Sequence, residues 1–255
     1  MITLPQGPSF RLDGRRALVT GGSGGIGLAA AVALGRAGAH VTVAARRAPE
    51  LEAACDAMRA DGIACDALVL DVTECAAVDQ AVTDREPFDI LINNAGMNRP
   101  KPMVDLSNGD IDAVLDLNVK ATFYTSRAVA RSLIAAGKPG SIITISSQMG
   151  HVGSPGRTLY CASKHAVEGM TRALAWELGP QNIRVNTLCP TFIETAMTAP
   201  MFEAPDFRRW VCDRIALGRV GQVSEIMGAV VFLAGDAASL MTGSALMLDG
   251  GWSAA

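Results

Sequence analysis

Short apolar segments alternate with longer segments of helical periodicity from residue 16 almost to the end of the chain. The apolar segments predict β-strands at 16–20, 41–45, 67–72, 88–93, 141–146, 184–189 and 245–248. The segments between them predict helices at 25–37, 49–60, 107–135, 158–178 and 224–234, and a further helix starting near Glu74. Gly38 closes the first of these helices, and Ser107 and Ser224 are the expected caps of two others.

Strands that are apolar along their whole length, and that are separated by helices, indicate a parallel sheet covered on both faces. No Pro/Ser-rich linker or internal repeat divides the chain. We therefore expect a single α/β domain over residues 1–255, with a Rossmann-like, doubly wound parallel sheet of about seven strands.

The stretch 194–222 interrupts this alternation, because it mixes Met197, Met201, Phe202, Phe207 and Trp210 with prolines and arginines. So long a segment between a strand and a helix predicts a lid over a substrate. The alternative is a surface excursion that packs its own apolar residues.

Composition excludes several classes of protein. The chain has 255 residues, of which 49% are hydrophobic and 18% charged, so it is not disordered. Its 26 glycines follow no Gly-X-Y period, which excludes a collagen-like fold. The formal net charge of −3 provides no electrostatic reason to expect a nucleic-acid partner.

The chain also lacks sequence signals for a membrane, a secretory route or a metal site. No apolar run approaches the length of a membrane helix, and the N-terminal residues contain no apolar leader segment. The six cysteines form no C-x-x-C pair and no histidine cluster accompanies them, so we expect no metal site. These features predict a cytoplasmic protein with reduced thiols that does not bind membranes.

A glycine-rich stretch, Thr20-Gly-Gly-Ser-Gly-Gly-Ile-Gly27, lies between the first predicted strand and the first predicted helix. Without Cβ atoms the backbone N–H groups can approach a pyrophosphate, and the start of the helix adds positive potential. The stretch predicts a dinucleotide-binding turn, and a tight turn without a ligand is the alternative. The expected cofactor contacts are Gly21, Ser23, Gly24, Gly25, Ile26 and Gly27.

The end of the second strand bears on the choice of dinucleotide. An acidic residue there would accept hydrogen bonds from the ribose 2′-hydroxyl of NAD, but this chain has Ala45 followed by Arg46 and Arg47. A guanidinium can pair with a 2′-phosphate, so we expect NADP(H), contacted by Arg46, with NAD(H) as the alternative. If both arginines are merely solvated charges, this preference loses its support.

The third strand ends in Asp71 and Val72, which we also expect along the cofactor. The Asp71 carboxylate could accept a hydrogen bond from the adenine amino group. It could equally cap the helix that starts near Glu74.

Tyr160 and Lys164 stand four residues apart near the start of a predicted helix, so their side chains share one face. The chain has only two tyrosines and four lysines, which makes such a pair rare by chance. An ammonium close to a phenol lowers the phenol's pKa from about 10. The pair therefore predicts an acid–base group that exchanges a proton with a carbonyl or an alcohol.

Five motifs together resemble the short-chain dehydrogenase/reductase family: Thr20–Gly27, Asn93–Gly96 (NNAG), Asn118, Ser147 and Tyr160-x-x-x-Lys164. Their order and spacing match the family over nearly the whole chain, with Ser147 thirteen residues before Tyr160. The resemblance implies that this fold carries a nicotinamide cofactor. The alternative is a non-catalytic dinucleotide sensor on the same fold, which would be expected to lack Ser147, Tyr160 or Lys164, whereas this chain has all three.

The resemblance implies a role for each matching residue. Tyr160 is the expected general acid and base, Ser147 binds the substrate oxygen, Lys164 holds the nicotinamide ribose and tunes Tyr160, and Asn118 helps to hold a water in a proton relay. Further expected cofactor contacts are Asn94, Ala95, Gly96, Pro190, Ile193 and Thr195. Two residues depart from the family pattern: Thr191 stands where glycine is usual, and Gly24 stands where NADP-dependent members often carry a basic residue.

The implied reaction is hydride transfer between the nicotinamide and a secondary alcohol or its ketone, without a metal. Arg99, His151 and Arg157 suit a sugar or a sugar acid of the gluconate or glucose type, whereas the apolar lid suits a 3-oxoacyl thioester. The resemblance also implies a homotetramer or a homodimer.

Overall fold

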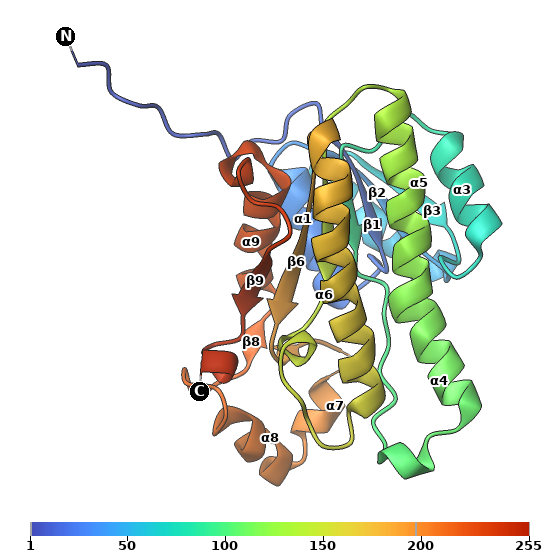
Figure 1. Ribbon diagram of the computed structural model, residues 1–255, viewed down its shortest axis with the longest axis vertical. Helices are drawn as coiled ribbons and strands as arrows, with labels where there is room; N and C mark the ends of the chain where they lie inside the picture. Colours follow the sequence, from blue (N-terminus) through green and yellow to red (C-terminus); the bar gives the residue numbers. More distant parts are fainter. Residues whose placement is uncertain (1, 197, 255) are drawn as a thin grey trace.

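The computed structural model describes residues 2–196 and 198–254, and it confirms the predicted Rossmann-like α/β fold. Seven strands form one parallel sheet in the order β3-β2-β1-β4-β5-β6-β9 (Figure 1). The strands are β1 (Arg16–Thr20), β2 (His40–Ala45), β3 (Cys65–Val69), β4 (Ile90–Asn93), β5 (Gly140–Ile145), β6 (Ile183–Pro190) and β9 (Ala245–Leu248).

Helices cover both faces of the sheet, and a separate apolar core lies under each face. On one face α1 (Gly25–Arg36), α2 (Ala48–Ala60) and α9 (Ser224–Ala234) pack on the strands through residues such as Leu34, Leu51 and Val230. On the other face lie α3 (Cys75–Thr83), α5 (Ala121–Ala135) and α6 (Thr158–Leu178), with Val129 and Leu133 in the core. Figure 1 shows α5 and α6 side by side in front of the sheet.

Apart from one predicted helix that is divided in two, the predicted elements match the observed ones except at their ends. The third strand lies at Cys65–Val69 instead of 67–72, because Asp71 forms a turn in which it accepts hydrogen bonds from the N–H and hydroxyl of Thr73. The fourth strand begins at Ile90 instead of residue 88, and the first helix ends at Arg36.

The two predicted serine caps have different outcomes. Ser107 caps α4 (Asn108–Leu115) and accepts a hydrogen bond from the Asp110 N–H at 3.1 Å, as predicted. The prediction for Ser224 is wrong, because this residue is the first residue of α9 and Val223 precedes it as the cap. The long helix predicted at 107–135 is divided into α4 and α5 by a π-helical turn at Asp116–Lys120.

The stretch 194–222 forms small elements of its own, namely β7 (Ile193–Glu194), α7 (Ala199–Phe202), α8 (Pro205–Cys212) and β8 (Gly221–Gln222). Phe202, Val211, Ile215 and Val220 make a third apolar core. The Phe192 ring packs on it, 6.2 Å from the Phe202 ring centre. The stretch therefore does pack its own apolar residues; Met197 lies outside the described residues.

Over the described ranges, no helix combines the length and the apolar character that crossing a membrane requires.

Candidate active site

The sheet order reverses between β1 and β4, which places a crevice beyond the carboxyl ends of these neighbouring strands. Asn94 ties the two strand ends together, because its amide nitrogen donates hydrogen bonds to the carbonyls of Thr20 and Gly21, both at 3.0 Å. The Thr20 hydroxyl in turn accepts from the N–H groups of Asn94 and Ala95 at 3.0 and 3.2 Å. These contacts hold the glycine-rich turn in place.

The glycines of this turn have distinct steric reasons to be glycine. Gly21 and Gly25 have φ angles of +63° and +54°, which favour glycine. A Cβ on Gly27 would lie 2.4 Å from both the Asn94 amide nitrogen and the Gly21 carbonyl oxygen. Gly24, by contrast, is exposed, and a Cβ on it would meet no atom of the described residues within 4 Å.

The turn has room for a phosphate group. Helix α1 has twelve residues, and no side chain caps its N-terminus at Gly24, so its first N–H groups face the space beside the exposed glycines. Ser23 is half-buried at this turn, and Ile26 packs its side chain partly against the core. The turn therefore fits the pyrophosphate of a dinucleotide.

Arg46 and Asp71 face one another at the carboxyl ends of β2 and β3. Their closest atoms, Nη1 and Oδ2, are 3.9 Å apart, and the Arg46 side chain is 65% exposed. Burial acts to raise the pKa of Asp71, but the hydrogen bonds from Thr73 and the charge of Arg46 outweigh it and hold the pKa below its usual value. Asp71 caps no helix, since α3 begins after Glu74.

The side chains of two expected cofactor contacts point into the core. Val72 is buried under one face of the sheet and Ile193 under the other, so only their main-chain groups can meet a ligand. Pro190 is likewise buried, in the last position of β6.

The segment after β6 lies opposite the glycine-rich turn. The Thr195 methyl group is 3.6 Å from the position of a Cβ on Gly25. Thr191 Oγ1, like Asn98 Oδ1 in the loop after β4, is buried without a hydrogen-bond partner in the described part of the chain. Since buried polar atoms are nearly always paired, these two atoms are free to form hydrogen bonds with a bound ligand.

Ser147 and Lys164 come from different elements, the loop after β5 and helix α6. Ser147 follows β5 and is 6% exposed; its hydroxyl accepts from the Met149 N–H at 3.1 Å and donates to Gln148 Oε1 at 2.8 Å. Lys164, on the first turns of α6, is 7% exposed, and its ammonium donates to the Ile145 carbonyl at 2.8 Å. Both side chains are thus held by hydrogen bonds next to the end of β5.

Burial shifts the pKa values of Tyr160 and Lys164 in opposite directions. It raises the pKa of Tyr160 to about 12, although the Ser147 hydroxyl and the charge of Arg157 act to lower it. It lowers the pKa of Lys164 to about 8. The predicted lowering of the Tyr160 pKa by Lys164 is therefore wrong for this structure, because the ammonium reaches Ile145 and lies 5.5 Å from the tyrosine ring centre.

Asn118 lies in the π-helical turn and is buried, so it is not a residue of an exposed helix face. Its side-chain oxygen accepts a hydrogen bond from the Met97 N–H at 2.8 Å. Its side-chain nitrogen donates to the Met97 carbonyl at 2.9 Å and to the Ser163 hydroxyl at 3.0 Å. Ser163 then donates to the Tyr160 carbonyl at 2.8 Å. A Cβ on Gly96 would lie 3.2 Å from the Asn118 oxygen, so the loop after β4 packs closely here.

Three groups near this site were difficult to find from the sequence. Ser163 connects Asn118 to Tyr160 and carries no motif signal beyond its place between Tyr160 and Lys164. Glu168 and Cys189 are buried polar residues on α6 and β6. A charged residue one helical turn after Lys164 was the available signal for Glu168.

Comparisons with known proteins agree on one family. A family model described as enoyl-(acyl carrier protein) reductase matches residues 21–253. Gluconate 5-dehydrogenase of Gluconobacter oxydans (strain 621H) is 41% identical over 246 residues, covering 95% of this chain and 96% of that protein. D-Erythrulose reductase of Gallus gallus is 38% identical over 245 residues, covering 96% and 98%.

A solved structure is similar over the same length. The crystal structure of a gluconate 5-dehydrogenase from Burkholderia cenocepacia J2315 in complex with NADP and tartrate has a TM-score of 0.93 and 37% identity to this chain. The match covers 96% of this chain and 98% of that one.

Proposed function

Because the chain belongs to the short-chain dehydrogenase/reductase family, we propose that it interconverts the keto and hydroxyl groups of a sugar acid with NADP(H). The broader activity, an oxidoreductase acting on a ketone and a secondary alcohol, follows from the family and its named members. The observation that carries the narrower proposal is the half-buried guanidinium of Arg157 beside the Tyr160 phenol.

Tyr160 is the proposed acid and base. Its raised pKa keeps the phenol protonated at neutral pH, which is the form that donates a proton to a carbonyl oxygen during reduction. Ser147, whose hydroxyl interacts with Tyr160, would turn its O–H from Gln148 Oε1 to the same substrate oxygen as negative charge develops on it. For alcohol oxidation the phenol must lose its proton, and the positive charge of Arg157 favours that loss.

Lys164 and Asn118 complete the proposed catalytic group. Lys164 would bind the nicotinamide ribose hydroxyls through the ammonium that now contacts Ile145. Asn118 holds the loop at Met97 and, through Ser163, the start of α6, and in this proposal it helps to hold a water in a proton relay.

The cofactor is NADP(H) in this proposal, with NAD(H) as the alternative, and it supplies or accepts the hydride when bound. Gly21, Ser23, Gly24, Gly25, Ile26 and Gly27 would hold the pyrophosphate, and Arg46 the 2′-phosphate. Support comes from the absence of a carboxylate at Ala45 and from NADP in the Burkholderia relative. The remaining proposed contacts are Asp71, Val72, Asn94, Ala95, Gly96, Pro190, Ile193 and Thr195.

A substrate carboxylate is the proposed partner of Arg157. Burial lowers the pKa of this arginine, which is the cost of holding a guanidinium out of water without a carboxylate beside it. An anionic substrate would pair with it next to the reacting carbonyl. The named gluconate 5-dehydrogenase relatives act on a sugar acid, which supports this substrate class.

The stretch 194–222 is the proposed substrate lid, since its aromatic cluster begins at Phe192, directly after Thr191. Homotetramer formation, or a homodimer, and a cytoplasmic location are further parts of the proposal. All six cysteines are free thiols, which supports a reducing compartment.

The test is a steady-state assay of the purified protein with NADPH and with NADH. A keto-gluconate and D-erythrulose, a neutral ketose, serve as the two substrates. We expect NADPH with the keto-gluconate to have the highest kcat/KM. This value should be at least tenfold above that for NADH with the keto-gluconate and that for NADPH with D-erythrulose. Preference for the neutral ketose would overturn the sugar-acid proposal, and no turnover with any combination would overturn the catalytic one.

A further inference from the structure

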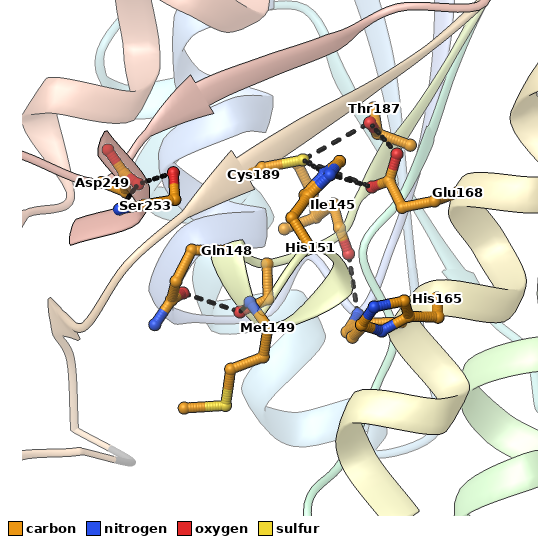
Figure 2. A network of polar contacts seen from close by, with 12 residues as sticks. Ile145, Gln148, Met149, His151, His165, Glu168, Thr187, Cys189, Asp249 and Ser253 are labelled. Carbon is orange, nitrogen blue, oxygen red and sulfur yellow. Dashed lines mark hydrogen bonds and ion pairs between the residues drawn. The ribbon is translucent and has the colours of Figure 1, made fainter. Parts of the chain in front are cut away.

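Three side chains from different elements meet between α6, β6 and the short helix that follows β5. His151 follows the short helix η3 (Gln148–Gly150), Glu168 lies on α6 and Cys189 lies on β6. Figure 2 shows their polar ends pointing toward one another. His151 Nε2 is 3.6 Å from Cys189 Sγ and 3.5 Å from Glu168 Oε1, and Cys189 Sγ is 3.3 Å from the same Glu168 oxygen.

The three distances have the geometry of a metal coordination shell. They describe a nearly equilateral triangle, and a point at the centre of a triangle with sides of about 3.5 Å is about 2.0 Å from each corner. Zn²⁺ binds histidine nitrogen and carboxylate oxygen at about 2.0–2.2 Å and thiolate sulfur at about 2.3 Å, so an ion slightly above the plane meets all three atoms.

The same geometry argues against a nucleophilic cysteine. A Cys–His–Glu relay needs the thiol on one ring nitrogen and the carboxylate on the other, so that a proton passes through the ring. Here both partners approach Nε2, and the thiol also lies against the carboxylate. Three groups converging on one point is the arrangement of ligands around an ion.

Burial and charge favour a cation at this point. The Glu168 side chain is 3% exposed, and in the described ranges His151 is its one potential ion-pair partner within 4 Å. A buried carboxylate is stable only when paired or bound to a metal. The His151 side chain is 29% exposed, so it provides a route for an ion from solvent.

Neighbouring groups orient the carboxylate. Thr187 on β6 donates a hydrogen bond from its hydroxyl to Glu168 Oε2 at 3.0 Å, which leaves Oε1 turned toward His151 and Cys189. Such outer contacts fix the direction of metal ligands in known sites. A Cβ on Gly150 would lie 3.1 Å from Glu168 Cγ, so η3 packs closely against this side chain.

We propose that His151 Nε2, Glu168 Oε1 and Cys189 Sγ form a three-ligand site for Zn²⁺, whose fourth position is open to solvent beside His151. The Cys189 thiol releases its proton to solvent as the zinc–sulfur bond forms. A thiolate ligand disfavours Mg²⁺ and Ca²⁺, which prefer oxygen ligands. The bound ion would fasten η3, which Ser147 caps, to the end of β6, and it adds a site that the pattern of cysteines in the sequence did not predict.

The test uses the full-length protein, freed of metal with a chelator and titrated with Co²⁺ as a spectroscopic substitute for Zn²⁺. We expect one Co²⁺ per chain, a sulfur-to-cobalt charge-transfer band, and visible bands of a four-coordinate ion that Zn²⁺ abolishes by displacement. Cys189→Ser should remove the charge-transfer band. His151→Gln should weaken Zn²⁺ binding at least about 100-fold.

Matched controls separate this site from other thiols and histidines. His165→Gln changes the neighbouring histidine of α6, whose Nδ1 contacts the Cys161 carbonyl, and should leave binding unchanged. The double change Cys55→Ser with Cys65→Ser removes a pair of thiols elsewhere in the fold, with sulfurs 2.9 Å apart, and should leave the band intact.

Thr187→Val provides a graded variant, with an expected 10- to 100-fold loss of Zn²⁺ affinity. Thermal unfolding of each variant without metal reports whether it is folded, and added Zn²⁺ should raise the Tm of the wild type and of the controls only. Absence of the band in folded wild type, or its persistence in folded Cys189→Ser, would overturn the proposal.

Discussion

The Lys164 ammonium donates a hydrogen bond to the Ile145 carbonyl at 2.8 Å, within the buried layer between α6 and β5. One hydrogen bond does not replace the water that a charged ammonium loses on burial, so the pKa of Lys164 falls to about 8 from 10.5. In the unfolded chain the same group keeps its ordinary pKa. The folded protein therefore binds fewer protons than the unfolded chain between these two values.

The free energy of unfolding should consequently rise with pH between about 8 and 10.5. The penalty for the buried charge is complete below pH 8, fades as pH rises through this window, and is absent above it, and its size is roughly 3 kcal/mol. Urea unfolding at several pH values should show this rise in the wild type but not in Lys164→Met. Parallel pH curves for the two proteins would show that Lys164 stays charged in the folded state.

Replacement of Tyr160 by Phe should abolish most turnover. It removes the proposed acid and base but keeps the ring, so kcat should fall by about 10²- to 10⁴-fold while NADPH still binds. Tyr124→Phe is the matched control, because Tyr124 packs against the core with the Arg127 guanidinium 5.8 Å from its ring centre. Equal kcat values for wild type and Tyr160→Phe would refute the assignment.

The sequence predicts the strands of the sheet better than the turns at their ends. The sheet and its strands follow from apolar segments, because strands buried on both faces need apolar side chains throughout. The predicted ends of the strands were less accurate. The turn at Asp71 depends on a hydrogen bond from the Thr73 N–H, which the pattern of apolar residues does not reveal. The π-helical turn around Asn118 was likewise invisible in the periodicity.

At the candidate site, spacing predicted proximity but not direction. A spacing of four positions from Tyr160 to Lys164 places both on one helical face, yet the direction of the ammonium depends on the Ile145 carbonyl, which belongs to a strand. Similarly, His151, Glu168 and Cys189 are distant in sequence and meet only because η3, α6 and β6 pack together. Tertiary contacts of this kind need the fold as well as the motif.

The preference for NADPH over NADH should depend on Arg46. Its loss in Arg46→Ala removes a charge-assisted contact with the 2′-phosphate, so the KM for NADPH should rise about 10- to 100-fold while that for NADH changes little. Arg47→Ala is the control, since the Arg47 guanidinium already pairs with Glu50 at 3.0 Å. An unchanged ratio of NADPH to NADH kcat/KM in Arg46→Ala would exclude this role.

Arg157→Gln should separate charged from neutral substrates. If Arg157 pairs with the carboxylate, kcat/KM should fall about 10- to 100-fold for a keto-gluconate and much less for D-erythrulose. Arg172→Gln, on an exposed position of α6, controls for the loss of a positive charge. An equal fall for both substrates would mean that Arg157 acts on the Tyr160 phenol, whose pKa its charge lowers, instead of on the substrate.

Two glycines of the same turn should differ in their tolerance of alanine. In Gly27→Ala the added Cβ would press on the Asn94 amide and the Gly21 carbonyl, and backbone atoms cannot move away as a flexible side chain does. We expect a loss of about 1–3 kcal/mol in the free energy of unfolding, together with weaker NADPH binding, because Asn94 also holds the ends of β1 and β4. Gly24→Ala meets open space at an extended φ of −174°, so its stability should equal that of the wild type. Denaturant unfolding measures the free energy of unfolding of both variants, and titration measures their NADPH affinity. Equal stability of Gly27→Ala and Gly24→Ala would show that the turn can accommodate a Cβ at residue 27.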